Sequence, residues 1–327
     1  MKNTAINHNI GVLAYPGAQK SAIYGLVDLL SIADSVRKEG DNTGSALTPV
    51  IIESFGEDLS AHQDLAAIII PPSLEKDLGN SSFEVITRWL KARHDQGVLI
   101  CSVCAGAFIL AKTGLIEGRT ITTHWMFEEQ FRNDYPNIDL NINKLIVDDG
   151  DIVTAGGLSA WMDLGLFLVG RFTSPSIMLN TARIFLVDIK GREQSFFSTF
   201  TPNYNHGDKP IVKAQRWAQQ HFSSAMSVSD LSDQASLSRR TFIRRFKKAT
   251  HLNPSEYIQQ LRIAKAKEGL ELTNERIEAI AWSVGYEDVS AFRRIFQKST
   301  GLSPTAYRQR FSVAEENANP INSGESF

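Results

Sequence analysis

An internal repeat with an offset of 50 residues restricts how this chain can fold more than any other feature. The run RTFIRRFKKATHLNPSEY at 240–257 aligns without gaps with SAFRRIFQKSTGLSPTAY at 290–307, and eight of the 18 positions are identical. Chance would give about one identity over such a length, so a duplicated structural unit is expected in the C-terminal third. The identities include two phenylalanines and a tyrosine of each copy: Phe242 and Phe292, Phe246 and Phe296, Tyr257 and Tyr307.

Each copy has the pattern of two short helices joined by a tight turn. In the first copy, apolar residues at helical spacing from Val228 to Ala235 precede a turn at 236–238, and Ser238 is placed to cap a second helix. In the second copy, Gly285 marks the turn and Asp288 is the expected cap. The second helix of each copy would bury its phenylalanines and expose basic residues. This pattern predicts two helix–turn–helix units.

The sequence of the second unit is similar to a known family. The run AIAWSVGYEDVSAFRRIFQKSTGLSPTAYRQRF closely resembles the second helix–turn–helix of the AraC family, and the resemblance extends from Ile211 to Phe311. An amphipathic helix at 261–272 would join the two units. One departure is His251, where the second copy has Gly301. Glycine suits a left-handed helix end, so His251 should be slightly strained.

The resemblance to the AraC family places the second helix of each unit in the major groove of DNA. Six residues should then face base edges: Arg240, Ile243, Arg244, Ser290, Arg293 and Arg294. An arginine can donate two parallel hydrogen bonds to guanine, which is worth about 1–3 kcal/mol of discrimination. Four further residues are expected to bind phosphate: Arg239, Lys247, Lys248 and Lys298. The alternative is that these basic residues form only a solvated helix face.

Charge is divided unevenly along the chain. Residues 1–200 contain 16 Lys and Arg against 23 Asp and Glu, whereas residues 201–311 contain 18 against 10. Such a division suggests that only the second part meets a polyanion. We therefore expect residues 211–311 to form the DNA-binding domain, with a polar linker at 201–210 and a disordered tail at 312–327.

Residues 1–200 alternate short apolar runs with helical patterns. Strands are expected at 10–15, 66–70, 98–103, 144–147 and 151–155, and helices at 23–33, 83–92 and 105–110. The last two strands should pair around Asp149-Gly150. Alternation of helices with continuously apolar strands indicates an α/β, doubly wound, mostly parallel sheet. The predicted fold is this domain followed by an all-α tandem helix–turn–helix domain.

A candidate reactive site follows the third apolar strand. The strand runs into a sharp turn at Cys104-Ala105-Gly106 and then a helix, the pattern of a nucleophile elbow. The positive end of that helix would favour the thiolate of Cys104, and His124 could be its base partner. Cys101 and Cys104 also form a C-x-x-C pair, but Cys101 would point into the packing, which disfavours a redox disulfide. No second Cys/His pair completes a zinc site, so no metal or cofactor is expected.

The N-terminal part also resembles a known family. The YPG start at 15–17, the elbow and the VDDG…TAGG segment at 147–157 are similar to the PfpI-like branch of the class I glutamine amidotransferase superfamily. The whole sequence resembles the GlxA-type regulators, in which that domain is fused to an AraC-type DNA-binding domain. Enzymes of the superfamily place an acidic residue early in the first helix, but Ala22 occupies that position and Asp28 is a weak substitute. Pro72 stands where glycine is usual and offers no backbone N–H.

These patterns predict a sequence-specific DNA-binding transcription regulator that is not an enzyme, with a ligand-sensing and dimerising domain at 1–200. The ligand-pocket candidates are Cys104, Ala105, His124 and Ser73. A cysteine-dependent hydrolase or hydratase with an attached DNA-binding module is the alternative, and a purely dimerising scaffold is a third interpretation. The expected partners are double-stranded DNA, a small-molecule effector and a second copy of the chain. No signal sequence and no run of about 18 apolar residues is present, which predicts a cytoplasmic, nucleoid-associated bacterial protein without membrane contact.

Overall fold

The chain divides by its internal contacts into two units, Met1–Ser195 and Phe196–Phe327. The computed structural model describes residues 7–40, 45–54, 59–75, 83–189 and 193–314, and the statements below refer to these residues. Of the tail predicted to be disordered at 312–327, positions 315–327 lie outside the described residues. Each unit has its own buried apolar core.

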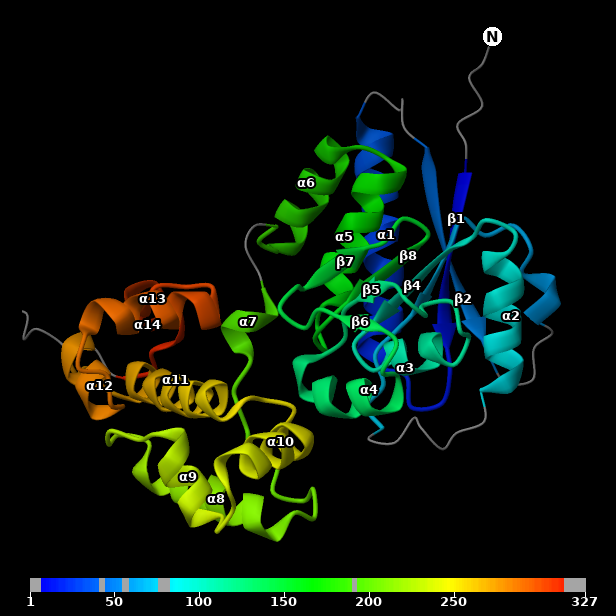
Figure 1. Ribbon diagram of the computed structural model, residues 1–327. Coiled ribbons are helices and arrows are strands. Elements are labelled where there is room, and N and C mark those ends of the chain that lie inside the picture. The colour runs from blue at the N-terminus through cyan, green and yellow to red at the C-terminus, as the bar shows by residue number, and fades with distance from the viewer. Residues whose placement is uncertain (1–6, 41–44, 55–58, 76–82, 190–192, 315–327) are drawn as a thin grey trace, which may run out of the picture. The chain divides into compact units, whose positions relative to one another are not determined.

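The first unit is built around a six-stranded sheet with the strand order β2-β1-β3-β4-β8-β7 (Figure 1). Its strands are β1 (Asn7–Ala14), β2 (Ala46–Glu53), β3 (Ala67–Ile70), β4 (Leu99–Val103), β7 (Ile146–Asp148) and β8 (Ile152–Ala155). All neighbouring strands are parallel except β7 and β8, which form the antiparallel pair expected around Asp149-Gly150. A separate parallel pair joins β5 (Thr120–Ile121) to β6 (Asp139–Leu140). The prediction of a mostly parallel α/β sheet is confirmed.

Strand β2 was not predicted from the sequence. It lies at one edge of the sheet, and Pro49 interrupts its apolar pattern. Proline cannot donate a hydrogen bond to a neighbouring strand, and an edge strand tolerates it because one side has no neighbour. Pro49 is tolerated because β2 is an edge strand, and the same proline breaks the apolar pattern from which a strand could have been predicted.

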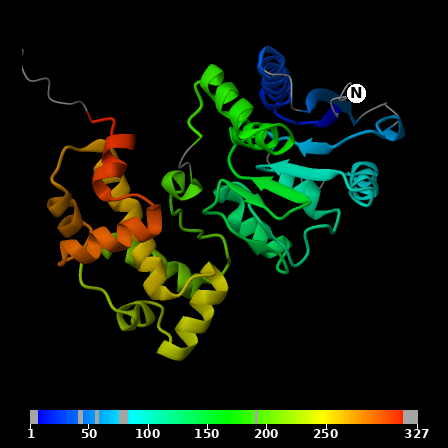
Figure 2. The ribbon, with the colours of Figure 1, turned by 90° about the horizontal axis from the view of Figure 1, so that it is seen from above.

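Helices cover both faces of the sheet. They are α1 (Lys20–Glu39), α2 (Glu84–His94), α3 (Gly106–Ala111), α4 (Glu128–Asp134), α5 (Trp161–Phe172) and α6 (Pro175–Phe185). The crossover from β1 to β2 runs across the sheet in the opposite direction to the crossover from β3 to β4. Because crossovers between parallel strands are right-handed, α1 and α2 lie on opposite faces. Helices α1, α5 and α6 pack on one another (Figures 1 and 2).

The second unit is entirely helical. Its helices are α8 (Lys209–His221), α9 (Val228–Gln234), α10 (Arg239–Thr250), α11 (Pro254–Leu272), α12 (Ile277–Ser283), α13 (Val289–Thr300) and α14 (Pro304–Phe311). A short helix, α7 (Gln194–Phe197), spans the point where the first unit ends. Helix α11 contributes Tyr257 to the first helical core and Ile263 and Leu270 to the second. It is the bridging helix expected from the sequence, and it begins earlier than predicted.

The two copies of the repeat have the same internal structure. Thr250 Oγ donates to the carbonyl oxygen of Phe246 at 2.8 Å, and Thr300 Oγ donates to that of Phe296 at 2.8 Å. The ring of Phe246 packs edge-on against Tyr257 at 5.1 Å, and the corresponding rings of the second copy pack at 5.4 Å. The duplication inferred from eight identities is therefore a duplication of hydrogen bonds and ring packing.

The caps of the repeat were predicted with mixed accuracy. Asp288 accepts a hydrogen bond from the backbone N–H of Ser290 at 2.8 Å, as expected. Ser238 occupies the cap position of α10, but its hydroxyl donates to Thr241 Oγ and accepts no backbone hydrogen bond. The expectation for His251 is confirmed, because its φ of 59° is in the left-handed region that Gly301 occupies at 79°.

Exchanging the residues at the two helix ends should change stability in opposite directions. His251→Gly should raise the free energy of unfolding by about 0.5–1 kcal/mol, because glycine adopts a positive φ without a steric penalty. Gly301→His should lower it by a similar amount. Urea denaturation of the two variants and the wild type tests this, and equal midpoints for all three would contradict it.

Residues at the start of the predicted linker (201–210), and those just before it, pack on the helical unit. Buried Gln215 of α8 donates from Nε2 to the carbonyl oxygen of Asn203 at 3.0 Å, and buried Lys267 of α11 donates from Nζ to that of Ser198 at 2.6 Å. The ring of Phe200 packs edge-on against Tyr257 at 5.1 Å. Polar side chains of the helices thus bind the carbonyl groups of Ser198 and Asn203. The domain limits at 1–200 and 211–311 remain proposals.

No helix among the described residues is both long and apolar enough to cross a membrane. Within the same residues, no group of three or more His, Cys, Asp or Glu side chains is arranged to hold a metal ion.

Candidate functional site

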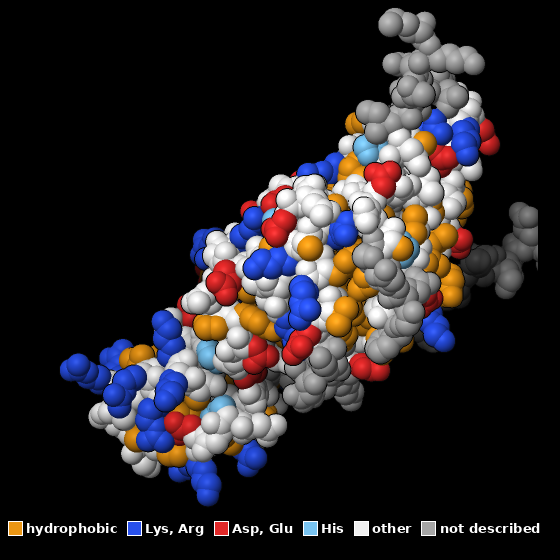
Figure 3. Space-filling model, turned by 90° about the vertical axis from the view of Figure 1, so that its right-hand side faces the viewer, with side chains coloured by type: hydrophobic (Ala, Val, Ile, Leu, Met, Phe, Trp, Pro, Cys, Tyr) orange, Lys and Arg blue, Asp and Glu red, His pale blue; other side chains and the backbone are white. Residues whose placement is uncertain are grey.

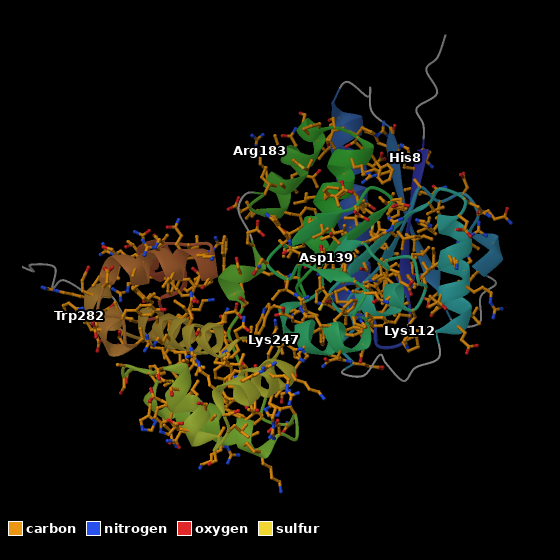
Figure 4. All side chains as sticks on the ribbon, in the orientation of Figure 1. His8, Lys112, Asp139, Arg183, Lys247 and Trp282 are labelled. Carbon is orange, nitrogen blue, oxygen red and sulfur yellow. The ribbon has the colours of Figure 1, made fainter. Side chains whose placement is uncertain are left out.

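Helix α10 presents one continuous basic face. Arg240, Arg244 and Lys247 are exposed at spacings of four and three residues, which places them on one side of a helix. Ile243 lies on the same side but is half-buried against the first helical core. Arg239 and Lys248 are also exposed, and Figure 4 labels Lys247 on this helix. The opposite face buries Phe242 and Phe246 completely, so the helix is fixed with its basic face outward.

Helix α13 repeats this arrangement. Ser290, Arg293, Arg294 and Lys298 are all exposed, while Phe292 and Phe296 are completely buried on the other face. One arginine is engaged within the protein, because Arg293 donates to Glu278 Oε1 of α12 at 2.6 Å. To contact DNA as predicted, Arg293 would have to leave the Glu278 carboxylate and bind a base or a phosphate group instead. The predicted DNA-contacting residues of each helix are thus brought to one face.

The arginines of these helices differ in whether they already have a partner. Arg245 donates twice to the carboxylate of Asp208, at 2.9 and 2.7 Å, and this contact holds the pKa of Asp208 below its usual range. Within the described residues, Arg244 and Arg294 have no ion pair. These two residues occupy equivalent positions of the repeat, so both helices offer a guanidinium without an ion pair at the same place. Figure 3 shows Lys and Arg side chains crowded at the lower left of the face that it draws.

The turn after β4 has the geometry of a nucleophile elbow. Cys104 has a φ of 54°, in the left-handed region that side chains rarely adopt. A Cβ at Gly106 would lie 2.6 Å from the carbonyl oxygen of Ile70, so only glycine allows the following helix to approach β3 this closely. The backbone conformation predicted for residues 104–106 is present.

The thiol of Cys104 is not activated by this turn. Cys104 is 3% exposed, and burial raises its pKa to about 11, although a hydrogen bond from the Ala105 backbone opposes the rise. The backbone at the start of α3 favours the thiolate, as expected, but desolvation of the sulfur outweighs this effect. Cys101 is completely buried and its pKa is also raised, as expected for a cysteine that points into the packing.

Comparison with known families separates the chain into the same two parts. Residues 50–170 match the DJ-1/PfpI family, and residues 231–310 match a helix–turn–helix domain. The chain joins a DJ-1/PfpI domain to an AraC-type helix–turn–helix domain.

Individual relatives are similar over part of the chain. The HTH-type transcriptional regulator CdhR of Pseudomonas aeruginosa is 25% identical over 210 residues, covering 64% of this chain and 62% of CdhR. Protein DJ-1alpha of Drosophila melanogaster is 29% identical over 139 residues, covering 42% of this chain and 62% of that protein. The crystal structure of Drosophila melanogaster DJ-1beta is similar with a TM-score of 0.46 and 20% identity, covering 56% of this chain and 100% of that one. The matches to CdhR and DJ-1alpha span less than two thirds of those proteins.

In the DJ-1/PfpI domain, His124 is not arranged as a base for Cys104. Its Nδ1 accepts a hydrogen bond from the backbone N–H of Met126 at 3.1 Å, so the proton of the neutral ring lies on Nε2. Burial lowers the pKa of His124, which favours this neutral form. Neither residue has a hydrogen bond to the other within the described residues. A ring that carries its proton on Nε2 and uses Nδ1 for the backbone has no nitrogen free to accept a thiol proton.

The other predicted pocket residues of the DJ-1/PfpI domain have structural contacts. Ser73 donates from Oγ to the carbonyl oxygen of Gly17 at 3.1 Å and accepts from the N–H of Glu75 at 3.0 Å. Ala105 is buried, as is Ala22 at the position of the missing acid, while Asp28 is exposed on α1. A separate groove of about 320 Å³ in this domain lies between β7, α5 and α6 and does not include these residues.

Two residues near the elbow were missed at the sequence level. Tyr15 is buried, donates to the carbonyl oxygen of Pro71 at 2.7 Å, and has a raised pKa because of burial and the nearby Cys104 and Glu75. Its position at the end of an apolar strand before Pro-Gly was a usable signal. Gln194 is 3% exposed, far from the elbow in sequence, and nothing in its polar surroundings at 193–195 marked it as buried.

The reactivity of Cys104 can be measured directly. With a pKa of about 11, its alkylation by iodoacetamide at pH 8 should be at least about 100-fold slower than that of a free cysteine, and the rate should keep rising above pH 9. A Cys104→Ser variant gives the background from Cys101. An inflection below pH 8 would show an activated thiolate and contradict this account.

Proposed function

We propose that this chain is a sequence-specific DNA-binding transcription regulator whose helix–turn–helix units read adjacent major grooves. The observation that carries the proposal is the pair of matched basic faces on α10 and α13, which carry exposed arginines without an ion pair at the equivalent positions 244 and 294. CdhR, which is 25% identical over 210 residues, is named an HTH-type transcriptional regulator, which supports it.

The bridging helix has a length that suits this function. Helix α11 has 19 residues, which at the usual rise of an α-helix is about 28 Å. Successive major grooves on one face of DNA are separated by about 34 Å. Because α11 is continuous and packs into both helical cores, it fixes the separation of the two units, and we propose that this separation is close to one turn of DNA.

Within the same proposal, the DJ-1/PfpI domain binds a small-molecule effector without catalysis. The elbow backbone is retained, but the thiol is protonated at neutral pH and His124 cannot accept its proton. The alternative, a cysteine-dependent hydrolase or hydratase, would need a thiolate at Cys104 and a base that accepts its proton. The candidate pocket residues Cys104, Ala105, His124 and Ser73 remain the proposed site of the effector.

A homodimer in the cytoplasm is also part of the proposal. Helix α6 and the residues after it leave large apolar side chains at the surface: Leu179, Ile184, Leu186 and Ile189. Leu186 is 92% exposed. A cluster of exposed apolar side chains marks an association surface in many proteins, and a second copy of the chain is the partner that we propose for it.

Selection of binding sites from a pool of random double-stranded DNA tests the proposed function without knowledge of the operator. The full chain should enrich sites with two short elements about 10 base pairs apart, because two readers are held by one helix. Enrichment of no sequence, or of a single element only, would contradict the proposal. Binding to the enriched DNA should also weaken steeply with salt, since basic residues displace counterions from phosphate.

A further inference from the structure

Both polar atoms of the buried Gln194 side-chain amide form hydrogen bonds within the protein. Its Nε2 lies 2.9 Å from each of three acceptors, Thr122 Oγ, the Thr123 carbonyl oxygen and the Lys144 carbonyl oxygen. Its Oε1 accepts a hydrogen bond from the backbone N–H of Trp125 at 3.2 Å. A side-chain amide that is 3% exposed and bound in this way fixes the backbone around it.

The space for this amide exists because residue 156 is glycine. A Cβ at Gly156 would lie 1.9 Å from Gln194 Nε2 and 2.3 Å from its Cδ. Even alanine at this position would therefore displace the Gln194 side chain. Gly156 and Gln194 form a complementary pair although they lie 38 positions apart in the sequence.

The residues bound by Gln194 include those on either side of His124. Thr123 precedes His124 and presents its carbonyl oxygen to Nε2, while Trp125 follows it and donates to Oε1. Thr123 is also tied to the elbow, because its Oγ donates to the carbonyl oxygen of Cys104 at 2.7 Å. A chain of hydrogen bonds thus runs from Cys104 through Thr123 to Gln194.

Gln194 is at the same time the start of the connection to the DNA-binding unit. It is the first residue of α7, and the first unit ends at the next residue, Ser195. Its backbone N–H donates to the carbonyl oxygen of Asn143 at 3.0 Å, and Lys144 Nζ pairs with Glu193 at 2.9 Å. The last turn of the DJ-1/PfpI domain is therefore anchored by the same amide that holds the His124 loop.

We infer that Gln194 couples the Cys104–His124 elbow to the junction with the helix–turn–helix domain. An effector that moves the loop on either side of His124 must lengthen or break hydrogen bonds of Gln194, and this changes how the first residues of the junction are held. This inference rests on the proposed function, because it assigns the route by which the effector site would act on DNA binding. It needs no chemistry at Cys104.

Hydrogen–deuterium exchange on the full chain tests the anchoring. Gln194→Leu removes the amide, and Gly156→Ala displaces it without changing Gln194. Both variants should raise exchange about tenfold in peptides covering 120–126 and 193–198. Gln130→Leu, at an exposed glutamine, and Gly40→Ala, where a Cβ meets nothing closer than 3.6 Å, should leave both peptides unchanged. Wild-type exchange at both peptides in a folded Gly156→Ala variant would overturn the inference.

A change at the elbow end tests the coupling itself. Thr123→Val keeps the shape of the side chain and removes the hydrogen bond to Cys104, whereas Thr113→Val removes a comparable buried bond to Leu110 elsewhere. Thr123→Val should raise exchange in the 193–198 peptide, and it should add nothing in the Gly156→Ala background. A change confined to residues 120–126 would overturn the inference. If these results hold while the chain selects no DNA sequence, the proposed function fails and the coupling stands.

Discussion

Replacing Arg244 and Arg294 together with alanine is expected to weaken sequence-specific DNA binding strongly. These residues occupy the same position in α10 and α13, are exposed, and have no ion pair within the described residues, so each guanidinium is free to bind a base edge. Two lost arginine–guanine contacts, at about 1–3 kcal/mol each, weaken specific binding by at least about 30-fold. Fluorescence anisotropy with DNA enriched by selection measures the effect.

The control removes the same charge from the other domain. Arg88 and Lys91 are exposed on α2, and alanine at both positions should leave the affinity for the enriched DNA within about twofold, because neither lies in the helix–turn–helix domain. Retained specific binding by the Arg244/Arg294 variant would overturn the assignment of the reading residues.

Replacing Phe296 with alanine should destabilise the second helix–turn–helix unit by about 3–5 kcal/mol. Phe296 is completely buried and packs against the rings of Phe292 at 5.6 Å and Tyr307 at 5.4 Å. The loss is large compared with the total stability of a small domain, so specific DNA binding should fail as the unit unfolds. Chemical denaturation followed by circular dichroism of the full chain measures it.

A matched control for this variant lies in the same unit. Trp282 on α12 is 60% exposed, and Figure 4 labels it. Trp282→Ala should lower the free energy of unfolding much less than Phe296→Ala, because Trp282 keeps most of its surface in water whereas Phe296 is completely buried. Equal destabilisation by the two substitutions would show that the second core is not organised around Phe296.

The helix–turn–helix domain could be predicted in detail because the residues that pack and cap its helices occur twice in the sequence, at an offset of 50 residues. Phe242 and Phe292, Thr250 and Thr300, and Tyr257 and Tyr307 recur at one offset, and each pair has the same contact in the structure. These contacts join residues that are close together in the sequence, so a local pattern is enough to predict them. The positive φ of His251 followed from its alignment with Gly301 in the same way.

The elbow could be predicted only as a backbone shape. The conformation of Cys104 and the need for Gly106 follow from a strand, a turn and a helix that are adjacent in the sequence. The pKa of the thiol depends on burial by distant elements, and the proton position on His124 depends on one hydrogen bond from Met126. Gln194 is 70 positions from His124, and no local pattern could place its amide beside that loop.

We propose that one chain holds its two helix–turn–helix units at a separation of about one turn of DNA. The affinity for enriched DNA should therefore fall at least tenfold when five base pairs are inserted between the two elements, because half a turn moves the second element to the opposite face. Inserting about ten base pairs should not restore full affinity to a single copy of the chain, since α11 has a fixed length. Unchanged affinity after the five-base-pair insertion would contradict the claim that α10 and α13 bind together.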